Sequence, residues 1–261
     1  MTSTARPSLQ DEIARLQPYG LGARGDTDND PGHYPQRSLH VLLAVSGSVA
    51  SIKAPLIVGK LLKYDRVEVQ VVATASSLHF FDKAALEREH AGRVKVWTDV
   101  DEWKVSPGQS HVLASSADVG NHWLCTQAWT KMGDPVLHIE LRRWADVVLI
   151  APCSANTLAK INHGICDNTL ASYQNSQTSV LRALPTFVPV LLFPAMNTQM
   201  YSHPLTARQL RFVKDELSYT VHGPIAKTLA CGDVGLGAMF EWSDIVRLVQ
   251  EKYDLKERAT Q

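Results

Sequence analysis

The segment that decides the fold is "LHVLLAVSGSVASIK", Leu39–Lys53. Its first half is a continuous apolar run, which predicts a strand covered on both faces. Its second half is a turn containing Gly47, followed by residues with helical spacing as far as Tyr64. A buried strand that passes through a tight turn into a helix is the repeating unit of a parallel α/β sheet.

The same alternation continues along the chain. Further strands are predicted in "VEVQVVAT", near Val94–Trp97, and in "DVVLIAP", "PVLLFPA" and "SYTVHG". Helices are predicted at "LHIELRRWA", from about Pro204 to Leu217, and at "DIVRLVQEKY", where Ser243 is a candidate N-cap. We therefore expect an α/β protein with a parallel sheet covered by helices on both sides.

The chain divides into an arm and one folded domain. Residues 1–37 are polar and rich in Pro, Gly and Asp, so we expect a disordered arm with at most a short helix at "LQDEIARLQ". The folded domain is expected over residues 38–255. Two stretches fit its plan poorly, 105–127 and about 173–178, because neither has a clear period and long structureless loops are uncommon in compact domains.

Composition narrows the function classes. The chain has 261 residues, with 26 Lys and Arg against 26 Asp and Glu. This balance gives no electrostatic footprint for nucleic acid or an anionic membrane. No apolar run reaches the roughly 18 residues of a membrane span, and the N-terminus lacks an apolar signal core. The four cysteines lack zinc-ligand spacing, so we expect free thiols, no metal site and a cytoplasmic protein, with the nucleus left open as a second location.

Several polar segments lie just past predicted strand ends, where ligands of parallel sheets bind. In "SGSVAS", the hydroxyls of Ser46, Ser48 and Ser51 and the first-turn amides are suited to a single phosphate. The alternative is an ordinary strand-to-helix turn. "ATASS" has the same two readings. In "PCSANT", Ser154, Asn156 and Thr157 are suited to a ribityl chain or a phosphate, or else they cap a helix.

Two further segments carry side chains that can take part in catalysis or ligand binding. His138 and Arg142 share a helical face, where a histidine can move protons and an arginine can hold a carboxylate or phosphate. The alternative is a solvated helix end. Asn197 lies in a strand-to-loop turn between two methionines, where its amide can bind a ligand or form an Asx turn.

Taken together, six motifs resemble one family. They are "SGSVASIK", "DPVLHIELRRWAD", "SANTLAKI", "GICDN", "PAMNTQMY" and "LACGDVGLGAM", in this order. The chain resembles the phosphopantothenoylcysteine decarboxylases, within the homo-oligomeric flavin-containing cysteine decarboxylases, from roughly Leu39 to Val249. The resemblance implies a flavodoxin-like (Rossmann-like) three-layer sandwich that forms a homotrimer, or a heterotrimer with a paralogue, and binds FMN at subunit interfaces. It also implies decarboxylation of 4'-phosphopantothenoylcysteine to 4'-phosphopantetheine, on the route to coenzyme A.

The resemblance carries over residue by residue. It implies that His138 is the catalytic base and that Cys231 is the proton donor on a glycine-rich flap. The implied FMN contacts are Gly47, Ser48, Val49, Ser76, Ser154, Ala155, Asn156, Thr157 and Ala195. The implied substrate contacts are Asn197, Met200, Arg143, Lys227 and Ala230.

The chain departs from the family pattern in places. Removing 105–127 restores the family spacing, so we interpret it as a translated intron or a genuine surface insertion. "YQNSQT" splits a second motif, and "RALPTFVPV" replaces the usual "RAWDxSKP".

Two other functions remain open. Fungal relatives of this family inhibit a type 1-like protein phosphatase, and such regulators often carry a long acidic C-terminal tail. This sequence ends "YDLKERATQ" and keeps His138, Asn197 and Cys231 together, which favours the enzyme. A flavin prenyltransferase or a peptidyl-cysteine decarboxylase would share the fold. The "ACGDxGxGAM" pattern argues against the prenyltransferase. The sequence does not exclude the peptidyl-cysteine decarboxylase, although "DPVLHIELRRW" favours the coenzyme A pathway.

Overall fold

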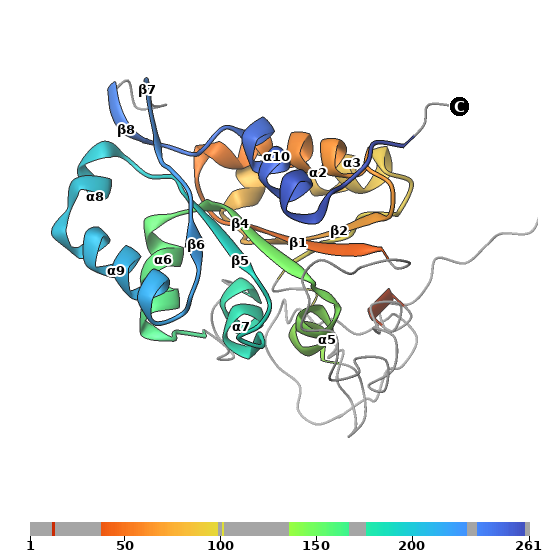
Figure 1. Ribbon diagram of the computed structural model, residues 1–261, viewed down its shortest axis with the longest axis horizontal. Coiled ribbons are helices and arrows are strands. Elements are labelled where there is room, and N and C mark those ends of the chain that lie inside the picture. Colours follow the sequence, from red (N-terminus) through yellow and green to blue (C-terminus); the bar gives the residue numbers. More distant parts are fainter. Residues whose placement is uncertain are drawn as a thin grey trace, which may run out of the picture.

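The computed structural model describes residues 12–13, 38–98, 101, 136–166, 176–228 and 234–258. Within these ranges, the chain forms a central sheet with helices above and below it (Figure 1). No helix in these ranges is both long and apolar enough to cross a membrane.

The central sheet has six parallel strands in the order β3-β2-β1-β4-β5-β6. Their bounds are β1 Leu39–Val45, β2 Val67–Ala73, β3 Val96–Trp97, β4 Val147–Cys153, β5 Val190–Pro194 and β6 Thr220–Val221. The strand order reverses between β1 and β4, which creates the switch point where such folds bind ligands.

Helices cover both faces of the sheet (Figure 1). One face carries α2 (Ala54–Leu61), α3 (Lys83–Glu89) and α10 (Trp242–Tyr253). The other face carries α5 (Leu137–Trp144), α6 (Ala155–His163), α7 (Ser176–Ala183) and α9 (Pro204–Asp215). Every residue of β1 and β4 is buried, as the continuous apolar runs predicted. Alternate residues serve the two cores, because Leu43 packs toward α2 and Leu42 toward α5.

Short elements follow the carboxyl ends of the strands. They are the 3₁₀ helices η1 (Val49–Lys53) and η2 (Ser77–His79) and the helix α8 (Thr198–Ser202). A separate antiparallel hairpin, β7 (Ile225–Thr228) and β8 (Val234–Ala238), extends beyond the sheet on the side where α8 lies (Figure 1).

The predicted α/β sandwich is confirmed, with three differences. Helix α10 is capped at Glu241 rather than at Ser243, which lies inside its first turn. The β7–β8 hairpin occupies a segment for which the sequence indicated only a flexible flap. In the N-terminal arm, Ile13 is helical and fully buried against the core on the α5 side. The insertion 105–127 lies outside the described residues, and 176–178 from the second insertion form the start of α7.

Candidate active site

The loops that follow β1 and β4 are locked together at the switch point. Ser46 is fully buried, and its Oγ donates to the carbonyl of Pro152 at 2.7 Å. The same Oγ accepts from the backbone N–H of Ser154 at 2.8 Å. These bonds join positions more than a hundred residues apart in sequence, so they fix the start of α6 against the end of β1.

Of the three hydroxyls proposed to bind an anion after β1, two have internal roles. Ser46 forms the link just described, and the buried Ser51 donates its Oγ hydrogen to the Ser46 carbonyl at 2.8 Å. Ser48 is half-buried and caps η1, where its Oγ accepts from the Ala50 N–H at 3.4 Å. Val49 beside it is exposed. Ser48 and Val49 are therefore the members of this turn that face outward.

The turn after β2 presses against the turn after β1. A Cβ added to Gly47 would lie 2.3 Å from Ser76 Oγ and 2.8 Å from Ser76 Cβ. Position 47 thus requires glycine for space. Ser76 is exposed, and its Oγ lies 3.1 Å from Thr74 Oγ1. The structure therefore brings Gly47, Ser48 and Ser76 together at one edge of the sheet.

The start of α6 contributes the other side of this edge. Ser154 caps the helix, since its Oγ accepts from the Thr157 N–H at 3.2 Å, and Thr157 is also buried. The capping interpretation of this segment is therefore confirmed. Asn156 is exposed in the first turn, and Ala155 is partly exposed beside it. Ala195 lies next to this edge, because its N–H donates to the Cys153 carbonyl at 3.0 Å.

Asn197 is the N-cap of α8, in the loop that follows β5. Its side-chain oxygen accepts from the Gln199 N–H at 2.8 Å, so the Asx-turn interpretation is also confirmed. Met200 is exposed in the same helix, and its carbonyl accepts from Thr206 Oγ1 at 2.6 Å, which ties α8 to α9. Lys227 lies on the hairpin, exposed and paired with Glu241.

His138 lies apart from the β1–β4 edge. It is half-buried in the first turn of α5, and α7 packs between α5 and α6 (Figure 1). Arg142 connects α5 to α7 by donating from Nη1 to the Ala183 carbonyl at 3.3 Å. Arg143 is exposed and pairs with the buried Glu140 at 2.8 Å. Within one chain, the helix that carries His138 is thus separated from the start of α6 by a whole helix.

Two predicted residues, Cys231 and Ala230, lie outside the described residues. The hairpin strands on either side of them are described, and β8 packs against α8. The Met196 N–H, in the loop between β5 and α8, donates to the Gly237 carbonyl at 3.0 Å.

Two groups near the carboxyl edge were missed by sequence reasoning. His222 follows β6 and stacks on Phe193 with a centroid distance of 5.5 Å, and its ring is tilted against Phe240 at 6.0 Å. Partial burial lowers the pKa of His222, which favours the neutral ring. Thr198, at the start of α8, has a buried hydroxyl without a hydrogen-bond partner in the described structure. Both residues lie in segments that the sequence analysis quoted, "SYTVHG" and "PAMNTQMY", but no pattern marked either one as a site residue.

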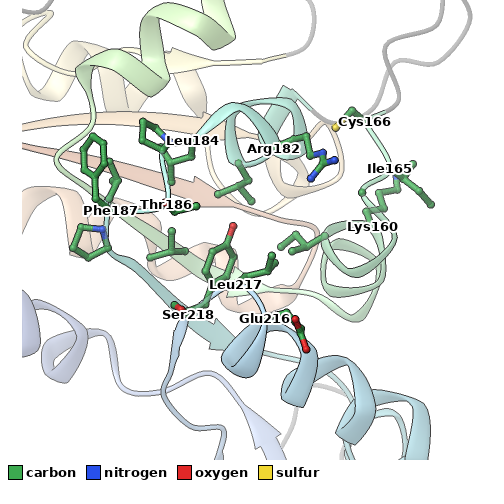
Figure 2. Close-up of a pocket in the computed structure, with 18 residues that line it drawn as sticks. Lys160, Ile165, Cys166, Arg182, Leu184, Thr186, Phe187, Glu216, Leu217 and Ser218 are labelled. Atoms are coloured by element: carbon green, nitrogen blue, oxygen red, sulfur yellow. The ribbon is translucent and has the colours of Figure 1, made fainter.

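A cavity of about 410 Å³ lies at the opposite, amino-terminal end of β5 (Figure 2). Lys160, Arg182 and Glu216 come to it from the ends of α6, α7 and α9. Lys160 and Arg182 occupy last turns of helices, where basic residues stabilise the exposed carbonyls. None of the residues that we predicted for the site lines this cavity. The described residues contain no group of side chains arranged to hold a metal ion.

Comparison with known proteins decides the family. Residues 31–254 match the family model described as Flavoprotein.

The chain belongs to the flavoprotein family.

This flavoprotein is 44% identical over 229 residues to the phosphopantothenoylcysteine decarboxylase of Arabidopsis thaliana, covering 88% of this chain and 91% of that protein. It is 44% identical to the solved structure of a PPC decarboxylase mutant complexed with pantothenoylaminoethenethiol, covering 82% of this chain and 98% of that chain, with a TM-score of 0.66. A third relative is the solved structure of the FMN binding protein AtHal3, at 44% identity and a TM-score of 0.64, covering 84% of this chain and 98% of that chain.

Proposed function

We propose that this flavoprotein is an FMN-dependent decarboxylase that converts 4'-phosphopantothenoylcysteine into 4'-phosphopantetheine, a step toward coenzyme A. The observation that carries the proposal is the 44% identity over 98% of a solved PPC decarboxylase whose ligand is a pantothenoyl compound ending in an ethenethiol. That ligand has lost the carboxylate of the substrate and retains its sulfur on an unsaturated carbon. The named relatives therefore point to one substrate class and one reaction type.

The carboxyl edge fits FMN in shape and in chemistry. Gly47 lets the turns after β1 and β2 approach to a distance that any side chain would prevent. The polar groups on this edge are neutral hydroxyls, an amide and first-turn N–H groups, which suit the phosphate and ribityl chain of FMN. We assign FMN to the turn at Gly47, Ser48, Val49 and Ser76, to Ser154, Ala155, Asn156 and Thr157 at the start of α6, and to Ala195. When bound, FMN supplies the reversible transfer of a hydride, which no side chain here provides.

The chemistry explains why a redox cofactor serves a decarboxylation. The thiol-bearing carbon of the substrate gives up a hydride and its sulfur gives up a proton, which leaves a C=S bond. The bond to the carboxylate then breaks, CO₂ leaves, and its electron pair forms a C=C bond while the sulfur becomes an ene-thiolate. The carbon that lost CO₂ then takes a proton, and the thiol-bearing carbon regains the hydride. No net oxidant or reductant is consumed.

The side chains of this chain position the substrate and transfer protons. His138 acts as the base that removes a proton from the substrate. Asn197 binds the substrate through its amide, and the exposed Met200 packs against it. Arg143 and Lys227 attract its carboxylate or phosphate. Both cations pair with a glutamate in this structure, Glu140 and Glu241, so substrate must compete for them. Ala230 contacts the substrate, and Cys231 supplies the final proton.

A second copy of the chain completes the site in this account. Helix α7 lies between the helix of His138 and the start of α6, which supports delivery of His138 by a neighbouring subunit. An apolar stripe next to the FMN edge supports the same assembly, because Val49, Ile52 and Leu56 are 49%, 57% and 44% exposed in the single chain. We propose a homotrimer, or a heterotrimer with a paralogue, located in the cytoplasm.

The test is to purify the protein, record its visible spectrum and measure CO₂ and 4'-phosphopantetheine after adding 4'-phosphopantothenoylcysteine. A yellow protein that forms both products supports the proposal. His138→Asn should abolish turnover, whereas the matched control His163→Asn, at an exposed position on α6, should retain it. A colourless, inactive protein that binds a type 1-like phosphatase would favour the regulatory alternative.

A further inference from the structure

The β7–β8 hairpin packs tightly against the Thr198 side chain at Gly235. A Cβ added there would lie 2.8 Å from Thr198 Oγ1, 2.9 Å from Thr198 Cγ2 and 3.4 Å from Thr198 Cβ. The backbone of Gly235 does not adopt the left-handed conformation that favours glycine. Glycine is therefore required at this position because the Thr198 side chain occupies the space.

The hairpin also contacts the segment before α8 and the end of β5. The Met196 N–H donates to the Gly237 carbonyl at 3.0 Å, two residues from Gly235. At the base of the hairpin, the Phe240 ring packs on Phe193 with a centroid distance of 6.1 Å. The hairpin therefore packs against α8 and the end of β5, and Thr198 determines how closely β8 approaches α8.

The contact between Thr198 and Gly235 has an energetic cost. Thr198 Oγ1 is buried and has no hydrogen-bond partner in the described part of the chain. A buried polar atom without a partner is unfavourable, so an apolar contact alone would serve packing better. The arrangement thus favours close contact between α8 and β8 over local stability.

We propose that Thr198 is a positioning residue of the reaction, which fixes the β7–β8 hairpin relative to the helix that carries Asn197 and Met200. This inference rests on the proposed function. In the sequence, the residues that join Thr228 to Val234 include Cys231, so the separation of β8 from α8 governs how the proposed proton donor meets a substrate held by α8. Thr198 itself transfers no proton.

The test separates the early and late halves of the reaction. Holoenzyme is mixed with 4'-phosphopantothenoylcysteine in a single anaerobic turnover, and CO₂ and 4'-phosphopantetheine are measured. The wild type should give both in equal amounts. Gly235→Ala should lower 4'-phosphopantetheine about tenfold more than CO₂, because the added methyl displaces β8 from α8.

A second substitution should reverse the first. In Gly235→Ala combined with Thr198→Ala, the two closest atoms are gone and the added methyl meets only the Thr198 Cβ position, at 3.4 Å. The ratio of the two products should therefore return toward one. The matched control is Gly59→Ala, where the nearest atom to an added Cβ is 3.9 Å away, and its products should stay equal to those of the wild type.

The outcomes distinguish the two claims. A wild type that releases no CO₂ would overturn the proposed function. If the wild type is active but Gly235→Ala lowers both products in proportion, the contact has a structural role only and the inference is wrong. Failure of the double variant to restore the ratio would also overturn it. Circular dichroism and the bound-flavin spectrum check that each variant is folded and loaded.

Discussion

Replacing Ser46 by alanine removes the hydroxyl that joins the β1 and β4 loops. The change deletes the bond to the Pro152 carbonyl at 2.7 Å and the bond from the Ser154 N–H at 2.8 Å. The Pro152 carbonyl keeps a second donor, since the Ser46 N–H reaches it at 3.3 Å. The Ser154 N–H loses the hydroxyl that accepts from it, in a buried position.

The magnitude follows from these bonds. A lost hydrogen bond costs about 1 kcal/mol, and a buried donor left unpaired costs about 1–3 kcal/mol, so the free energy of unfolding should fall by about 2–4 kcal/mol. A domain of this kind has about 5–15 kcal/mol in total, so the variant should still fold. Because the link fixes the start of α6, affinity for FMN should also fall about tenfold, which corresponds to about 1.4 kcal/mol.

The assay is urea unfolding of the apo-protein at one fixed concentration, together with titration of FMN by quenching of its fluorescence. Ser51→Ala is an internal comparison that loses a single buried bond, at 2.8 Å, and should cost about 1 kcal/mol. Ser243→Ala, at an exposed position, is the neutral control. If Ser46→Ala unfolds like the Ser243 control, or loses stability without losing FMN affinity, the link between the two loops does not support the site as argued.

Three further predictions concern the same edge and its surroundings. Gly47→Ala should weaken FMN binding about tenfold, measured by calorimetry. Adding Ser76→Gly to Gly47→Ala should recover more FMN affinity than adding Ser76→Ala. Both second changes remove the Ser76 hydroxyl, but only glycine also removes the Ser76 Cβ, at 2.8 Å. Wild-type affinity in Gly47→Ala alone would contradict this. The Ile52 side chain is 57% exposed in the single chain, so Ile52→Asp should leave the subunit folded. The mass measured by light scattering should shift toward that of a monomer. An unchanged mass would show that the apolar stripe is not part of the subunit interface. Burial raises the pKa of the Cys153 thiol, so iodoacetamide at pH 8 should label Cys153 only after unfolding, and rapid native labelling seen by mass spectrometry would show that the position is accessible.

Much of the fold was predictable because it depends on local patterns. The continuous apolar runs of β1 and β4 predicted buried parallel strands, and a turn leading into a helix after each of them predicted the ligand edge. The β7–β8 hairpin was not predicted. Its second strand, "VGLGA", alternates with glycine, which is depleted in strands, and its pairing with "IAKT" depends on contact with α8.

Prediction of the site was limited for the same reason. Sequence spacing indicated that hydroxyls cluster after β1, but the inward turn of Ser46 depends on Ser154, which is 108 residues away. Thr198 lies in the "PAMNTQMY" motif, but nothing in the motif singled it out, because its close contact is with Gly235 in another element. The sequence predicts which side chains lie near the site and in what order along the chain. The direction in which each side chain points depends on tertiary contacts between distant segments.

The central claim is that FMN binds at the carboxyl edge between β1 and β4. The most direct measurement is amide hydrogen exchange of the purified apo-protein with and without FMN. We predict slower exchange in peptides that cover 46–51 and 154–158, with little change in peptides from 184–190, which line the cavity at the other end of the sheet. Protection confined to 184–190, or none at either edge when FMN is bound, would contradict the account.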